Sequence, residues 1–108
     1  MNQTRDLSTI SANLTKAGFS TDLREANALV VIRSGANKGL WIRHSHQNWY
    51  AITFIQLAYR IPSANHIENL CAECLHDEKF TNVEIPDILV EKFSLRLIDA
   101  EEHEKMEG

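Results

Sequence analysis

The spacing of the hydrophobic residues changes at Pro62, and this change constrains the fold more than any other feature of the chain. After Pro62, five apolar residues recur with the period of an α-helix. They are Ile67, Leu70, Cys71, Cys74 and Leu75. Before Pro62, the segment 28–33 is rich in β-branched residues, which are typical of strands. The sequence therefore predicts a chain that combines helices with a sheet.

Three helices are predicted from caps and periodicity. Residues 6–17 form the first, which Asp6 can cap, and Ser63 can cap a second over residues 64–77. Pro86 suits the first turn of a third helix. The third helix is expected to place Ile88, Leu89 and Phe93 on one face.

The segment between the first two helices is predicted to be a meander of three or four antiparallel strands, because short links join its β-prone runs. These runs are 19–24, 28–33, 40–45 and a long one over 49–61. Residues 95–98 are either a short last strand or a continuation of the third helix. The expected fold is α+β, with an N-terminal helix, this sheet, and two C-terminal helices packed on it.

Length and composition predict one domain over residues 1–108, ending in an acidic tail at about 99–108. Hydrophobic residues make up 44% of the chain, which excludes a disordered polypeptide. Two cysteines are too few for a disulfide scaffold. No run is long enough to cross a membrane, and no secretion signal is recognisable. A cytoplasmic location, without membrane contact, is the expectation.

The charge is divided unevenly along the chain. The formal net charge is −4, which argues against nucleic acid as a general partner. Residues 1–60 nevertheless carry an excess of four positive charges, and residues 61–108 an excess of eight negative charges. The two halves can attract each other within one chain, or attract the opposite halves of a second copy.

Cys71 and Cys74 form a C-x-x-C pair, which is found in zinc sites and in redox proteins. His44 and His46 are spaced to supply two further ligands. Both cysteines also fit the apolar helical stripe, and a second cysteine pair is missing. We therefore expect two small, reduced core residues, with no metal and no cofactor.

The aromatic residues point to a contact surface. Trp41, Arg43 and Trp49 are expected at the centre of the outward side of the meander, with Arg33 nearby. Leu40 and Ile42 are expected to face the helices. On the neighbouring strand, the inward set is expected to be Ala28, Val30 and Ile32, and the outward set Leu29, Val31 and Arg33. Tryptophan and arginine are enriched in binding hot spots. The alternative is that the chain itself buries this second face.

No catalytic motif is recognisable, so the first hypothesis is a small, non-catalytic interaction or regulatory protein. Its partner is expected to be another protein or a second copy in a homodimer. The second hypothesis is a nucleic-acid-binding module that uses the basic and aromatic strands. The third is a small-ligand protein or enzyme whose site includes His44 or His46.

Overall fold

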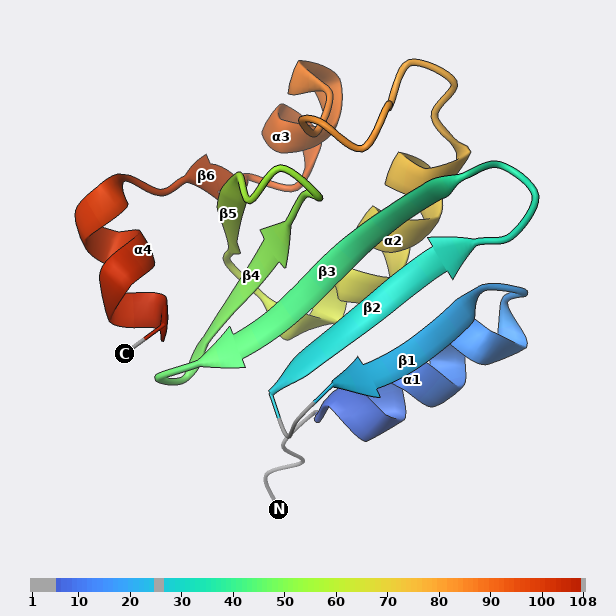
Figure 1. The fold of residues 1–108 in the computed structure, drawn as a ribbon, viewed down its shortest axis with the longest axis horizontal. Coiled ribbons are helices and arrows are strands. Elements are labelled where there is room, and N and C mark those ends of the chain that lie inside the picture. Colours follow the sequence, from blue (N-terminus) through green and yellow to red (C-terminus); the bar gives the residue numbers. More distant parts are fainter. Residues whose placement is uncertain (1–5, 25–26, 108) are drawn as a thin grey trace.

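The computed structural model describes residues 6–24 and 27–107, and a six-stranded antiparallel sheet lies at its centre (Figure 1). Each strand pairs with the next in the order β1-β2-β3-β4-β5-β6. The strands are β1 (Ser20–Arg24), β2 (Ala28–Arg33), β3 (Lys38–Ser45), β4 (Asn48–Ile52), β5 (Ala58–Ile61) and β6 (Arg96–Leu97). The α+β class and the antiparallel sheet are confirmed, but the predicted count of three or four strands is too low.

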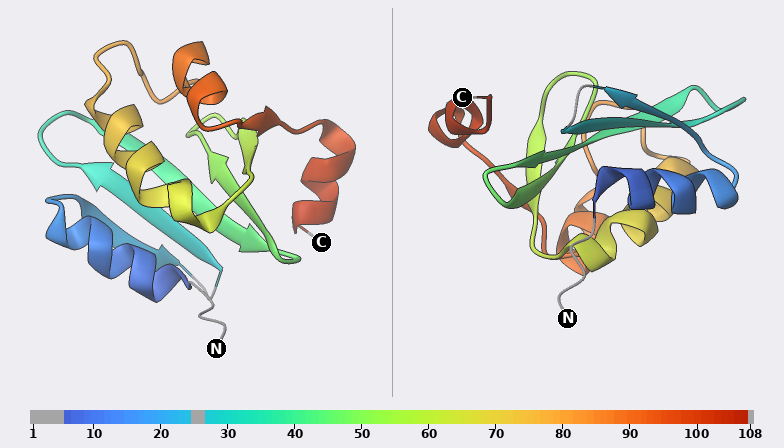
Figure 2. Two further views of the ribbon diagram at one scale, coloured as in Figure 1. Left: turned by 180° about the vertical axis from the view of Figure 1, so that it is seen from behind. Right: turned by 90° about the horizontal axis from the view of Figure 1, so that it is seen from below.

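Helices α1 and α2 cover one side of the sheet, which we call the inner face (Figure 2). The helices are α1 (Leu7–Lys16), α2 (Ile67–His76), α3 (Asp87–Lys92) and α4 (Ala100–Glu107), with a 3₁₀ turn at Ala64–His66. The predicted Asp6 cap is confirmed, whereas Ser63 caps the 3₁₀ turn before α2, and α2 itself begins after His66 without a side-chain cap. The Asp6 carboxylate accepts a hydrogen bond from the Thr9 amide at 2.8 Å, and the Ser63 hydroxyl accepts one from the Asn65 amide at 3.2 Å. No helix within the described ranges is long and apolar enough to cross a membrane.

The main core lies between the inner face and the helices. All five residues of the α2 stripe are fully buried in it, as the helical spacing predicts. The inner face contributes Leu29, Val31, Leu40, Ile42, Trp49, Ala51, Tyr59 and Ile61. The loop after α2 adds Phe80 and Ile85, which are 1% and 2% exposed. Removal of these apolar side chains from water is the main contribution to the stability of the fold.

The expected orientation of β2 is wrong. Leu29 and Val31 face inward, whereas Val30 and Ile32 face the opposite side. Directly paired residues of neighbouring strands share a face, and Val31 pairs with Leu40, which faces the helices. The sequence could not decide the orientation because four apolar residues in succession leave no polar residue to mark the outer side.

The predicted long strand over residues 49–61 is two strands, β4 and β5, joined by a turn whose first residue, Thr53, is buried and whose middle residues, 54–56, are exposed. The Thr53 amide donates to the Leu57 carbonyl at 2.9 Å, and the Thr53 hydroxyl accepts from the Leu57 amide at 3.2 Å. Gln56 has a φ of +72°, which is rare for a residue other than glycine. The turn contains no glycine, proline, asparagine or aspartate, so its composition does not mark it.

His46 and Gln47 form the two-residue turn between β3 and β4, with φ values of +50° and +68°. This hairpin geometry favours Asn-Gly, because an ordinary side chain is strained at positive φ. We expect the double substitution His46→Asn, Gln47→Gly to raise the free energy of unfolding by about 1 kcal/mol. Urea unfolding measures the gain. Gln47→Ala, which keeps the strain, is the control and should not stabilise the protein.

The C-terminal segment contains a helix within the expected acidic tail and one residue whose expected placement is wrong. Helix α4 occupies residues 100–107 of that tail, and the Asp99 carboxylate caps this helix by accepting from the Glu102 amide at 2.9 Å. In α3, Ile88 is 71% exposed and does not face the core with Leu89 and Phe93. A helix of six residues is too short for its periodicity to identify a face. Residues 96–97 form a short strand, so the segment 95–98 contains the last strand of the sheet and does not continue the third helix.

Candidate functional site

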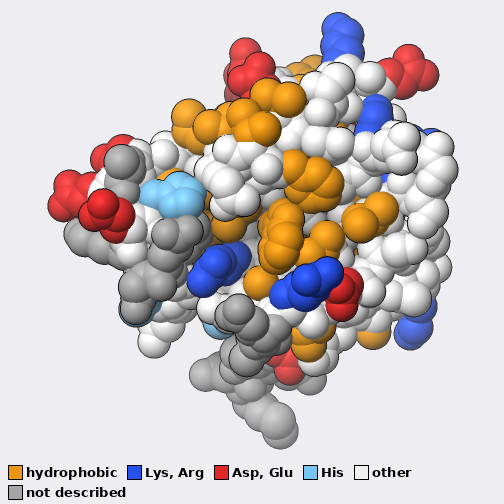
Figure 3. All heavy atoms as spheres, in the orientation of Figure 1, with side chains coloured by type: hydrophobic (Ala, Val, Ile, Leu, Met, Phe, Trp, Pro, Cys, Tyr) orange, Lys and Arg blue, Asp and Glu red, His pale blue; other side chains and the backbone are white. Residues whose placement is uncertain are grey.

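The sheet side opposite α1 and α2, here called the outer face, carries exposed apolar side chains. Ile32 on β2 is 39% exposed, and Phe54, which follows β4, is 43% exposed. Trp41 on β3 lies between β2 and β4 on this face and is half-buried. Figure 3 shows hydrophobic side chains gathered over the middle of this face, with basic side chains beside them. The grouping is typical of a contact surface.

Gly39 leaves room for the Phe54 ring to pack against β3. A Cβ atom at position 39 would come within 2.5 Å of the Phe54 ring. Gly39 also pairs with Ile32, so glycine leaves room for the ring beside an exposed isoleucine. The β4–β5 turn thereby adds an aromatic side chain to the outer face.

Four arginines stand in one line across the outer face, and we call them the arginine row: Arg24, Arg43, Arg60 and Arg96. The register places them in one line through consecutive pairs: Arg24 with Ala28, Ala28 with Arg43, Arg43 with Tyr50, Tyr50 with Arg60, and Arg60 with Arg96. The row therefore crosses all six strands, with Ala28 and Tyr50 filling its other two positions. Like charges on neighbouring strands destabilise a sheet unless a counter-charge binds them.

Carboxylates bind only the ends of the arginine row, within the described residues. Asp22 pairs with Arg24 at 2.5 Å, and Glu102 of α4 pairs with Arg96 at 2.8 Å. Of the two middle arginines, Arg60 donates to the Asn48 amide oxygen at 2.9 Å. The Arg43 Nε is buried and has no hydrogen-bond partner in the described part of the chain. Among the residues that the structure describes, no carboxylate matches the positive charge at the middle of the row.

The four residues expected at the contact surface lie on two different faces. Trp41 and Arg43 are on the outer face, as expected. Trp49 is 9% exposed on the inner face, where its ring stacks on His44 at a centroid distance of 4.0 Å. Arg33 donates to the Leu75 carbonyl at 3.2 Å and so binds the last turn of α2. The expected outward placement of Trp49 and Arg33 is therefore wrong.

Helix α4 covers one end of the outer face. It lies apart from the other helices, at the β5–β6 end of the sheet (Figure 2). Beside it, Tyr50, Ile52, Ala58 and Ile98 form a small second core, against which Trp41 packs. At this end of the sheet, therefore, the chain itself buries the outer face, which is the alternative that the sequence left open.

The two cysteines are fully buried in the α2 stripe and are free thiols. Burial raises the pKa of Cys74 to about 12, and it raises the pKa of Cys71 as well. A protonated, covered thiol is a poor nucleophile and a poor metal ligand. Within residues 6–24 and 27–107, no three histidine, cysteine or acidic side chains group closely enough to hold a metal ion.

We expect both thiols to resist Ellman's reagent in the native protein at pH 8, because the reagent needs an accessible thiolate. Unfolding in urea should release both at once. Asn69→Cys, at an exposed position of the same helix, is the matched control and should react immediately. Fast reaction of the native wild-type thiols would contradict the buried, protonated state.

An open hollow of about 360 Å³ lies beside α4, lined in part by Gln56, Asp99 and His103. A second hollow, of about 330 Å³, lies at the end of the arginine row and is lined by Arg60, Pro62, Ser94 and Arg96. Neither includes His44 or His46, the histidines considered for a ligand site.

No family model matches the chain, and no curated protein or solved structure is significantly similar to it. A functional assignment must therefore start from the outer face itself. Sequence reasoning missed Arg60 and Arg96, which only the strand register brings into line with Arg43. Two sequence features pointed toward this surface: the excess of positive charge in residues 1–60 and the expected outward placement of Trp41 and Arg43.

Proposed function

We propose that the protein is a non-catalytic binding domain that contacts a different protein through its outer face. One observation supports this function most strongly: Trp41 and Arg43 lie two residues apart on β3 and share the face opposite α1 and α2, where exposed apolar groups adjoin the arginine row. Tryptophan and arginine beside exposed aliphatic groups are characteristic of interface hot spots. A cytoplasmic location is part of this proposal, in keeping with two free thiols.

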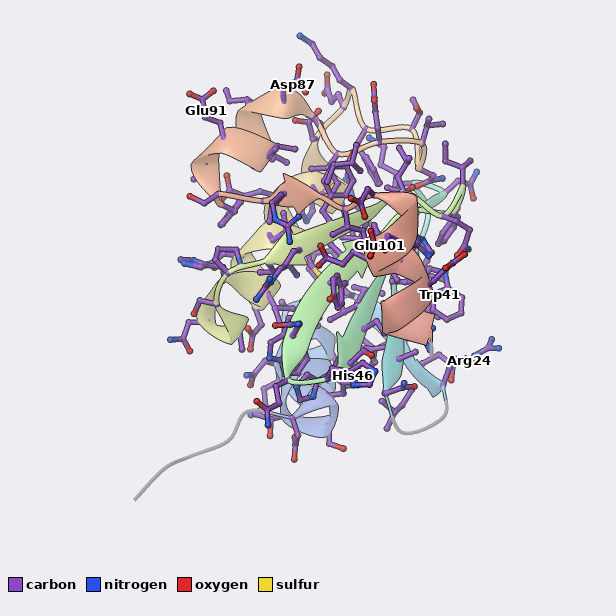
Figure 4. The ribbon with its side chains drawn as sticks, turned by 90° about the vertical axis from the view of Figure 1, so that its left-hand side faces the viewer. Arg24, Trp41, His46, Asp87, Glu91 and Glu101 are labelled. Atoms are coloured by element: carbon purple, nitrogen blue, oxygen red, sulfur yellow. The ribbon has the colours of Figure 1, made fainter. Side chains whose placement is uncertain are left out.

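Charge favours a different protein over a second copy. A two-fold dimer through the outer face would bring two arginine rows into one interface. The only carboxylate on the paired strands of this face is Asp22, and it already binds Arg24. The acidic residues Asp87 and Glu91 lie on α3, away from Arg24 and Trp41 (Figure 4). A second copy that docks face to face through these strands therefore offers the arginine row little complementary charge.

Site-specific photo-crosslinking in the native cells tests the proposal. A benzoylphenylalanine that replaces Ile32 should yield one defined protein product. The same residue in place of Ile88, the more exposed isoleucine of α3, is the matched control and should yield none. The double change Trp41→Ala, Arg43→Glu should abolish the product from position 32 while the far-ultraviolet circular dichroism stays unchanged.

Three results would contradict the proposal. Equal products from positions 32 and 88 would mean that the outer face has no special role. A product of twice the chain mass would favour the homodimer. A product sensitive to nuclease would favour the nucleic-acid-binding alternative.

A further inference from the structure

We propose that the occupant of the outer face is an acidic, amphipathic helix of the partner protein, lying along the arginine row. This inference rests on the proposed function and specifies the chemistry of the partner. It follows from three features: a helix of the chain already bound to the row, the spacing of the row, and the apolar residues beside it.

Helix α4 demonstrates the chemistry that the arginine row binds. Its Glu102 carboxylate accepts from Arg96 at 2.8 Å with one oxygen and from the Tyr50 hydroxyl at 3.4 Å with the other. Arg96 and Tyr50 are both members of the line of residues that contains the row. A glutamate on a helix is thus the natural counter-charge at one end, and Arg43 and Arg60 lack such a partner in the described residues.

The spacing of the row fits a helix laid across the strands. Neighbouring strands are about 4.8 Å apart, so the part of the row from Arg24 to Arg60, which excludes the end bound by α4, spans roughly 19 Å over four spacings. A helix rises about 5.4 Å per turn and covers that length with about 13 residues. Arg43 and Arg60 are two strands apart, which is close to the rise between helical positions i and i+7. Glutamates on one stripe of a helix can therefore reach both arginines.

Apolar groups lie next to the row on the same face. Trp41 is two residues from Arg43 on β3, and Ile32 and Phe54 lie farther along in the same direction. An occupant therefore needs an apolar stripe beside its acidic stripe, which is the pattern of an amphipathic helix. A single-stranded nucleic acid fits the row itself less well, because its bases would stack between the phosphate contacts and the one ring within the row, Tyr50, is only 3% exposed.

The probe is a synthetic 18-residue helical peptide with glutamates on one stripe and leucines on the adjacent stripe. Its affinity for the full-length protein is measured by calorimetry at low and high salt. We expect binding at least tenfold tighter than that of a scrambled peptide, and weaker binding at high salt. The single-stranded oligonucleotide (dT)18 is the competing class of ligand.

Variants locate the binding to the row. Arg43→Gln and Arg60→Gln should each weaken peptide binding about tenfold, as expected for loss of a charge-assisted hydrogen bond. Lys16→Gln, on α1, is the matched control and should leave the affinity unchanged. Glu102→Gln should strengthen binding about threefold, because it releases Arg96 for the peptide. Unfolding midpoints confirm that the variants remain folded.

Equal affinity for the scrambled peptide, no loss with either arginine variant, or tighter binding of (dT)18 would each overturn the acidic-helix inference. If position 32 still crosslinks a partner protein in cells, the proposed function stands and only the partner chemistry is wrong. If crosslinking and peptide binding both fail, the proposed function is wrong as well.

Discussion

Trp49→Ala is expected to lower the free energy of unfolding by about 3–5 kcal/mol, the usual cost of removing a large buried aromatic side chain. Trp49 is 9% exposed in the main core and stacks on His44 with the two rings 3° from parallel. The cavity left behind would open between the sheet and the helices. Urea unfolding followed by circular dichroism measures the loss.

Trp41→Ala is the matched control, because Trp41 lies on the neighbouring strand but on the outer face. It is half-buried, so its removal should cost less, about 1–2 kcal/mol. Trp41→Ala should instead reduce partner binding. If Trp41→Ala unfolds the protein and Trp49→Ala does not, the assignment of the two faces is wrong, and so is the proposed contact surface.

Thr53→Val is expected to cost about 1–3 kcal/mol, although valine nearly matches the volume of threonine. Thr53 is fully buried, and its hydroxyl accepts a hydrogen bond from the Leu57 amide. Valine would leave that amide with one acceptor fewer inside the turn that separates β4 from β5. The expected result is a lower urea midpoint with little change in the cooperativity of unfolding.

Thr81→Val is the control for this change, since Thr81 is exposed and should tolerate the substitution within about 0.5 kcal/mol. A Thr53→Val protein as stable as the wild type would show that the hydroxyl contributes little. The β4–β5 turn would then depend on its backbone hydrogen bonds alone.

Helices α1 and α2 were predictable because their period is contained in consecutive residues. The α2 stripe from Ile67 to Leu75 and the Asp6 cap can be recognised without knowledge of the fold. The β4–β5 turn was not predictable, because Thr53 makes it through its side chain in the middle of an apolar run. The orientation of β2 was missed for a related reason: Val30 and Val31 are equally suited to either face.

The candidate site was predictable only in part. Trp41 and Arg43 are two residues apart and their strand alternates clearly, so the outer face of β3 could be assigned. Arg60 and Arg96 are 36 residues apart and meet only through the β5–β6 pairing. A surface assembled by long-range register leaves no local pattern in the sequence. Trp49 was misplaced because its strand begins after a two-residue turn that reverses which residues face inward.

In the meander, most paired strands are close together in the sequence, with one exception. Every strand from β1 to β5 pairs with a neighbour a few residues away, and only β6 closes a long loop. Local pairs form quickly, whereas a long loop must lose more chain entropy before it closes. With only two paired positions, β6 and the attached α4 should be the first unit to open in the native state. Among the strands, amide hydrogen exchange would then be fastest at residues 96–97. Each opening would also remove Arg96 from the arginine row and leave Arg60 as its last member.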